Sequence, residues 1–219
     1  MELNLSEALR YLGVRGEPDP ALLAELSGVA DRLTRTVAPR WVWRVFPLSL
    51  REEGAALEGT GLVLTGGLAR RMLGECSQAV LLACTLGAGF ETMLRAQQVR
   101  NMARAAMLDA CGSAWVEAGC DAAGEEIAAR FPGLHPTDRF SPGYGDLPLA
   151  LQKDICGLLD APRRLGVQVG DSCLMNPTKS VTAVIGLSDR PQPARIRGCG
   201  LCNLRENCQY RKEGKTCGA

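Results

Sequence analysis

Apolar residues recur at helical spacing early in the chain and again, over a longer stretch, near its middle. In residues 20–37 leucine, valine and alanine return every three or four positions after a Pro-Asp-Pro start, and a second such pattern occupies residues 90–129. This spacing places apolar side chains on one face of a helix. The pattern therefore predicts two long helices. Shorter stretches of the same kind predict helices over residues 6–12, 68–73 and 147–159.

Runs of apolar, aromatic and β-branched residues predict strands instead. Residues 41–48 are rich in aromatic and β-branched types, and residues 79–86 form an uninterrupted apolar run that is typical of a buried strand. Weaker patterns predict further strands over residues 57–64, 167–175 and 180–187. Residues 139–146, which contain a proline and two glycines, are predicted to be irregular.

Charge and composition exclude several classes of function. A net charge of +1 gives no electrostatic reason to expect binding to nucleic acid or to an anionic membrane. No apolar run is as long as a membrane span, and the N-terminus lacks a signal-peptide pattern, so a cytoplasmic protein is expected. The single histidine, His135, lies in a predicted loop and offers no basis for a Ser/His/Asp or Cys/His site. No catalytic residue is predicted.

The ten cysteines fall into two sets. Six are scattered through apolar sequence and are predicted to be small buried residues in a reducing compartment. They are Cys76, Cys84, Cys111, Cys120, Cys156 and Cys173. The other four lie within the last 21 residues, with two, five and eight residues between successive cysteines. These are Cys199, Cys202, Cys208 and Cys217.

Four thiolates on a short, glycine-containing segment can ligate one metal ion or a four-iron cluster. Zinc sites more often consist of two close cysteine pairs, and only Cys199 and Cys202 form such a pair. Six basic residues oppose two glutamates from Arg195 onward, which suits the negative charge of a cluster. The spacing therefore favours an iron–sulfur (4Fe–4S) cluster, with zinc and redox-active thiols as the alternatives.

The chemistry of residues 139–146 is unusual for a simple turn. The segment holds a fixed cation at Arg139, a hydroxyl at Ser141, a rigid proline, two glycines and Tyr144. Proline fixes one backbone torsion, and glycine permits close approach of another group. Two interpretations stay open on these residues alone, a ligand-facing loop and an ordinary surface turn.

Two segments together resemble a known family. They are Arg139-x-Ser141-Pro142-Gly143-Tyr144 and Asp171-Ser172-x-x-Met175-x-Pro177-x-Lys179-Ser180-Val181. In this combination they resemble the activation domain of cobalamin-dependent methionine synthase. Residues 79–87, an apolar run that ends in Thr85-Leu86-Gly87, resemble the stand-alone members of that family. The resemblance covers residues 1–188 and implies an α+β fold, with helices grouped around a twisted antiparallel sheet. Residues 189–198 are predicted to be a linker, and residues 199–219 form a four-cysteine tail that the family does not require.

The resemblance also implies a function. Domains of that family bind S-adenosylmethionine and support reductive remethylation of cob(II)alamin held by a partner domain. An electron donor of the flavodoxin or ferredoxin type makes cob(I)alamin, and the methyl group of S-adenosylmethionine traps it as methylcobalamin. This chain would then be the reactivation component, a methyltransferase acting on a methionine synthase or related corrinoid partner. Its cysteine tail would relay the electron.

The family's ligand contacts can be placed on this sequence. Arg139 is expected to pair with the ligand carboxylate, and backbone groups at Ser141 and Gly143 to meet the adenine edge. Tyr144 would face the adenosine or the sulfonium. A polar residue of the long helix, Ser113 or Glu117, is expected to contribute as well.

The sequence departs from the family pattern at one place. The family has an aromatic residue after the Ser-Val pair, and this chain has Ala183-Val184-Ile185 there.

Two other functions remain as alternatives. One is an iron–sulfur electron-transfer activator of another corrinoid protein, and the other is a zinc-stapled interaction domain.

Overall fold

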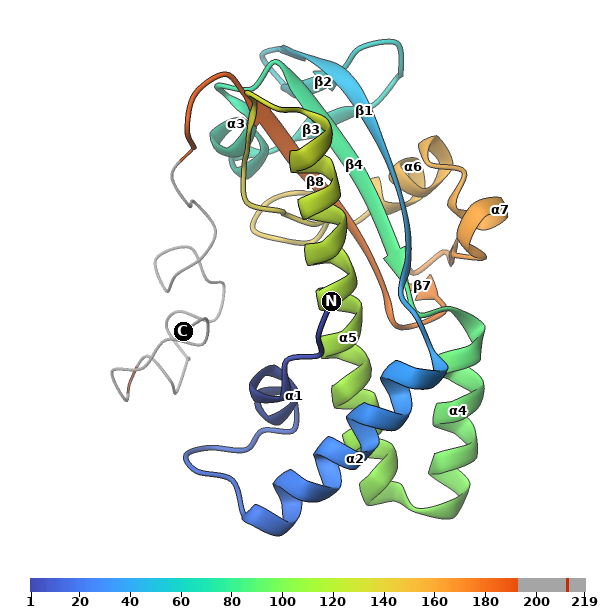
Figure 1. The fold of residues 1–219 in the computed structure, drawn as a ribbon. Helices are drawn as coiled ribbons and strands as arrows, with labels where there is room; N and C mark the ends of the chain where they lie inside the picture. The colour runs from blue at the N-terminus through green and yellow to red at the C-terminus, as the bar shows by residue number, and fades with distance from the viewer. Residues whose placement is uncertain (193–211, 213–219) are drawn as a thin grey trace. The chain divides into compact units, whose positions relative to one another are not determined.

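The computed structural model describes residues 1–192 and residue 212, which are drawn in colour in Figure 1. The helices are α1 Leu5–Tyr11, α2 Pro20–Thr36, α3 Gly67–Leu73, α4 Gly87–Arg100, α5 Met102–Arg130, α6 Leu151–Leu158 and α7 Ala161–Leu165. The strands are β1 Arg40–Leu50, β2 Gly54–Leu57, β3 Val63–Thr65, β4 Gln78–Thr85, β5 His135–Pro136, β6 Gln168–Val169, β7 Met175–Asn176 and β8 Ser180–Ser188. One sheet has the order β3-β2-β1-β4-β8-β5, and β6 pairs with β7 in a second sheet. The predicted α+β fold with an antiparallel sheet is confirmed.

The chain divides into two compact units. The first, called the helical unit here, consists of Met1–Val42, Ala83–Ile127 and Cys156–Val181. The second, called the sheet unit, consists of Trp43–Leu82, Ala128–Ile155 and the chain from Thr182. Because the division falls within β1, β4, β8, α5 and α6, each unit contains part of these elements.

In the helical unit, α2 forms where the apolar spacing predicts it. α2 starts at Pro20, and the Asp19 side chain caps it by accepting a 2.8 Å hydrogen bond from the Ala21 N–H. Small residues of α5 allow close packing against α4, since a Cβ at Gly112 would lie 2.3 Å from Cζ of the buried Phe90. The Trp115 indole N–H donates to the Val37 carbonyl at 2.7 Å, which holds α5 against the end of α2.

The prediction of one continuous helix over residues 90–129 is wrong, because two helices meet at Asn101. Asn101 is extended (φ −158°), and its side chain accepts a hydrogen bond from the Arg104 N–H at 3.0 Å. Asparagine competes well as a helix cap because its short side chain reaches the exposed backbone N–H groups of the first turn. The apolar spacing continues across this break, and the cap therefore cannot be recognised from periodicity.

In the sheet unit, β1 pairs antiparallel with β2, and β2 with β3. The predicted strand over residues 57–64 is wrong, because it spans the turn between these last two strands. The Leu57 N–H donates to the Leu62 carbonyl at 3.0 Å, and Gly59 takes a positive φ of 73° inside the turn. The core of this unit packs tightly at β8, where a Cβ on Gly186 would lie 2.5 Å from Sγ of Cys76.

Three shorter predictions also need correction. The helix predicted over residues 147–159 covers only Leu151–Leu158, because Pro148 and the turn before it lie outside the helix, and α7 follows separately. The strand predicted over residues 167–175 is a hairpin, β6 and β7, closed by a 2.9 Å bond from the Gly170 N–H to the Leu174 carbonyl. His135 lies not in a loop but in β5, opposite Ser188 of β8.

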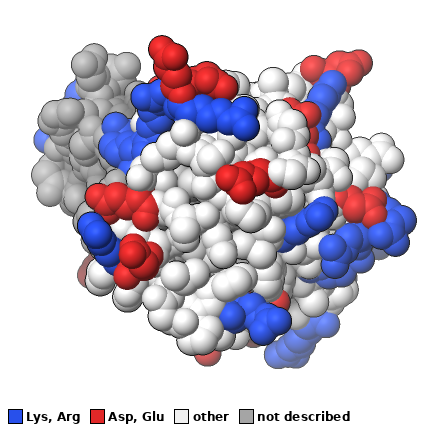
Figure 2. Space-filling model, turned by 90° about the horizontal axis from the view of Figure 1, so that it is seen from above, with Lys and Arg blue, Asp and Glu red and all other residues white. Residues whose placement is uncertain are grey.

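Five of the six scattered cysteines are buried as predicted, and Cys173 is only half-buried. Burial raises the pKa of the Cys111 thiol to about 12 and that of Cys156 to about 11, so both stay protonated and unreactive. On the face seen in Figure 2, basic and acidic side chains are interspersed among uncharged surface. Among the described helices, none combines the length and the apolar character needed to cross a bilayer.

Candidate functional site

The 139–146 loop is irregular, as predicted, and it is fixed to the sheet at its start. Phe140 is buried and exchanges two backbone hydrogen bonds with Val184 of β8, at 3.0 and 2.7 Å. Val184 belongs to the Ala183-Val184-Ile185 segment, which lacks the aromatic residue expected from the resemblance. All three of these residues are buried, so this segment forms core under the loop and presents no exposed side chain.

The middle of the loop is a tight turn that depends on glycine. Gly143 has a positive φ of 85°, a conformation that residues with a side chain rarely adopt, and its N–H donates to the Leu147 carbonyl at 2.8 Å. The Tyr144 N–H donates to the Ser141 carbonyl at 3.0 Å. Tyr144 is 47% exposed as a result, whereas Arg139 is half-buried.

The end of the loop is held by Asp146, whose role the sequence did not reveal. Its carboxylate accepts hydrogen bonds from the backbone N–H groups of Gly67 at 2.6 Å and Leu68 at 2.8 Å. The Gly66 backbone passes so close that a Cβ there would lie 2.9 Å from the Asp146 carbonyl oxygen. The hydrogen bonds from Leu68 and then Gly67 lower the pKa of Asp146 below its usual 3.8, because they stabilise the charged form.

Acidification is therefore expected to release the end of the loop from Gly67 and Leu68. The pKa of Asp146 is lower in the folded protein than in the unfolded chain. The stability that the ionised carboxylate gives to the folded protein is therefore complete above pH 3.8 and is lost as pH falls through the folded pKa. The amide NMR shifts of Gly67 and Leu68 should follow that titration. In an Asp146→Asn protein, which cannot titrate there, both shifts should stay constant over the same pH range. Equal titration in both proteins would contradict the assignment.

The four predicted ligand residues of the 139–146 loop lie in the sheet unit, whereas Ser113 and Glu117 lie on the α5 segment of the helical unit. Both α5 residues are half-buried. Ser113 is already engaged: its hydroxyl accepts a 2.8 Å hydrogen bond from Nζ of Lys179 and donates to the Asp109 carbonyl at 3.3 Å. Ser113 was predicted as a ligand residue, and its contact with Lys179 was not predicted.

Lys179, Asp109 and Ser113 form what we call the Lys179 cluster. Lys179 pairs with the Asp109 carboxylate at 2.9 Å, and only 15% of the lysine side chain is exposed. The backbone of Lys179 is held as well, since its carbonyl accepts from the Leu86 N–H at 3.0 Å. Next to it, the Thr178 N–H and hydroxyl both donate to one carboxylate oxygen of Glu91, at 2.7 and 2.6 Å. The Lys179 cluster thus joins the segment before β8 to α5, and the Thr178–Glu91 hydrogen bonds join it to α4.

The predicted metal ligands Cys199, Cys202, Cys208 and Cys217 lie outside the described residues. Within residues 1–192, no group of three or more His, Cys, Asp or Glu side chains is arranged to hold a metal ion. The metal site therefore remains a prediction from the cysteine spacing.

No family model and no curated protein sequence matches this chain. Its structure is similar to a crystal structure of the MetH reactivation domain bound to AdoHcy, with a TM-score of 0.60. The two sequences are 16% identical, and the similarity covers 95% of this chain and 80% of that one. The fold of this chain is therefore that of the reactivation domain.

Proposed function

We propose that this protein binds S-adenosylmethionine through the 139–146 loop and supports the reductive remethylation of cobalamin on a methionine synthase partner. One observation carries the proposal. The Arg139-x-Ser141-Pro142-Gly143-Tyr144 motif forms an anchored loop on a fold that is similar to a domain crystallised with AdoHcy. Neither the motif nor the fold would be sufficient by itself.

The groups of the loop are suited to this ligand. The Arg139 guanidinium can form a charge-assisted pair with the α-carboxylate of the ligand. The Ser141 N–H and the Gly143 carbonyl have no hydrogen-bond partner within residues 1–192, which leaves a donor and an acceptor for the adenine edge. The exposed ring of Tyr144 can lie against the sulfonium cation.

The proposed reaction needs no general base, because no proton is transferred. One electron reduces the cobalt of cob(II)alamin on the partner, and the resulting electron pair takes the methyl group from the sulfonium sulfur. The products are methylcobalamin and S-adenosylhomocysteine. The electron would come from a flavodoxin- or ferredoxin-type donor, and a 4Fe–4S cluster on the four tail cysteines would relay it.

The loop assignment predicts a loss of affinity for S-adenosylmethionine in Arg139→Ala and Tyr144→Ala proteins. Loss of a hydrogen-bonded charge pair costs about 1.5–3 kcal/mol, so Arg139→Ala should weaken binding by roughly 10- to 100-fold in calorimetric titration. Tyr11→Ala is a matched control, since Tyr11 is 43% exposed and lies in the helical unit. Unchanged affinity in both loop variants, with cooperative unfolding retained, would refute the assignment. Ser113→Ala and Glu117→Gln test the two α5 predictions in the same titration.

The metal content of the four-cysteine tail distinguishes this proposal from the two alternatives. Iron, sulfide and a broad visible absorption band in anaerobically purified protein would support the electron relay. Stoichiometric zinc would instead support a stapled interaction segment. A cluster in a protein that does not bind S-adenosylmethionine would favour an activator of another corrinoid protein.

A further inference from the structure

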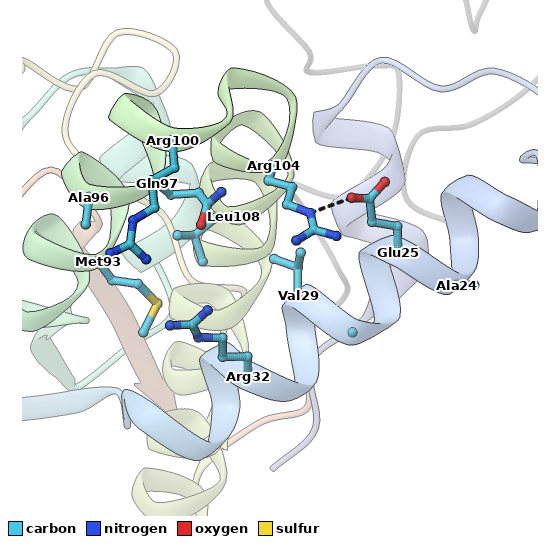
Figure 3. A pocket seen from close by; sticks show the side chains of 11 residues that line it. Ala24, Glu25, Val29, Arg32, Met93, Ala96, Gln97, Arg100, Arg104 and Leu108 are labelled. Carbon is cyan, nitrogen blue, oxygen red and sulfur yellow. Dashed lines mark hydrogen bonds and ion pairs between the residues drawn. The ribbon is translucent and has the colours of Figure 1, made fainter.

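Three helices of the helical unit, α2, α4 and α5, line an open cavity of about 380 Å³ (Figure 3). It is lined by Ala24, Glu25, Gly28, Val29, Arg32, Met93, Ala96, Gln97, Arg100, Arg104 and Leu108. None of these residues belongs to the 139–146 loop or to the Lys179 cluster. We call this cavity the α2–α4–α5 pocket. Its volume is within the range of about 300–1,000 Å³ that is typical of small-molecule sites.

The pocket has an excess of positive charge. Arg104 pairs with Glu25 at 2.6 Å, and Figure 3 shows the two side chains turned toward each other. Arg32 of α2 and Arg100 of α4 form no ion pair with any residue in the described part of the chain. Two guanidinium groups beside one cavity repel each other unless an anion lies between or near them. The charge of the pocket is therefore complementary to an anion.

Part of the pocket wall is apolar. Val29, Met93 and Leu108 line it, and Figure 3 shows Arg32 extending from α2 toward Met93. Gly28 lies in the interior of α2, where glycine is among the least favourable residues for a helix. A Cβ at Gly28 would meet no atom within 4 Å, so the glycine leaves this part of the pocket open. The pocket thus combines a cationic side with space for an apolar body.

We propose that the α2–α4–α5 pocket binds an amphipathic organic anion, with its acidic group at Arg32 and Arg100 and its apolar part against Val29, Met93 and Leu108. Guanidinium groups bind carboxylate, sulfonate and phosphate oxygens through paired N–H donors. Both the charge and the apolar wall are needed, so an inorganic anion alone would bind weakly. The pocket is lined by residues of the helical unit, whereas the proposed S-adenosylmethionine loop belongs to the sheet unit.

The test uses the full-length protein and two fluorescent probes. 8-Anilinonaphthalene-1-sulfonate carries a sulfonate on an aromatic body, and N-phenyl-1-naphthylamine is a similar body without the charge. Arg32→Gln and Arg100→Gln should each weaken binding of the sulfonate by about tenfold and leave the neutral probe unchanged. Arg35→Gln on α2 and Arg95→Gln on α4 are matched controls, because neither residue lines the pocket. Both controls should bind the sulfonate like the unmodified protein.

A second pair of variants tests the cavity itself. Gly28→Phe should fill the open space and abolish binding of both probes, while the melting temperature stays the same or rises, because a poor helix former is replaced without a clash. Gly28→Ala adds only one methyl group and should retain both probes. Two results would overturn the proposal: sulfonate binding that is unchanged in Arg32→Gln, Arg100→Gln and Gly28→Phe, or losses that are equally large in the Arg35→Gln and Arg95→Gln controls.

Discussion

Replacing Gly112 by valine is expected to lower the free energy of unfolding by about 3 kcal/mol. The Cβ of any side chain at this position would lie 2.3 Å from Cζ and 2.6 Å from Cε2 of Phe90. Phe90 is completely buried in the helical unit, so its ring can move only by displacing other close-packed side chains. The extra methyl groups of valine would enlarge the clash. Urea unfolding followed by circular dichroism measures the loss.

Gly124→Val is the matched control, because Gly124 lies on the same helix and a Cβ there would meet no atom within 4 Å. We expect this substitution to change the free energy of unfolding by less than about 0.5 kcal/mol. Equal losses at the two glycines would mean that helix propensity, and not contact with Phe90, determines the cost. A small loss at Gly112 would mean that α4 and α5 can separate easily.

Patterns of local sequence predicted most of the long elements. α2 and β4 were placed to within a residue or so, because amphipathic spacing and a continuous apolar run are properties of neighbouring residues. The break at Asn101 was missed, since one capping side chain outweighs a periodicity that continues on both sides of it. The turn after Leu57 was missed for a related reason, because short strands leave too few residues to establish an alternation.

The assignment of residues 139–146 to a ligand stays a prediction, whereas the contacts that hold this loop are known only from the structure. The arginine, glycines and tyrosine of the loop suggested a ligand site because they carry chemical information in the sequence itself. Its anchor could not be recognised, because Asp146 and Gly67 are 79 positions apart. Lys179 and Asp109 are likewise 70 positions apart. Contacts of this kind depend on the tertiary fold, and a single sequence contains no local pattern that reports them.

The same limit applies to the α2–α4–α5 pocket. In the sequence, Arg32 and Arg100 are ordinary charged residues on the polar side of two predicted helices. Only the packing of the helices brings them to one cavity with Val29 and Met93. Gly28 offered a weak signal, because a glycine inside an otherwise regular helix is unfavourable and often has a structural or functional reason.

Substitutions in the Lys179 cluster are expected to lower the stability of the folded protein, by an amount that depends on which partner is removed. Asp109→Ala leaves a lysine that is only 15% exposed with the Ser113 hydroxyl as its remaining side-chain partner. Lys179→Met leaves an aspartate that is 50% exposed and can be hydrated. Because a buried unpaired charge costs more than a hydrated one, we expect losses of roughly 3 kcal/mol for Asp109→Ala and roughly 1 kcal/mol for Lys179→Met.

The double variant Asp109→Ala/Lys179→Met should unfold at a higher urea concentration than Asp109→Ala alone, since the second change removes the uncompensated ammonium. A double variant that is less stable than either single variant would show that the two side chains act independently, through packing rather than charge.

The same variants also bear on the proposed function. Lys179 lies in the segment that resembles the methionine synthase activation domain, and the structure uses it to hold that segment against α5. Loss of stability without loss of S-adenosylmethionine affinity in Lys179→Met would therefore assign this lysine to the scaffold and leave the ligand to Arg139 and Tyr144.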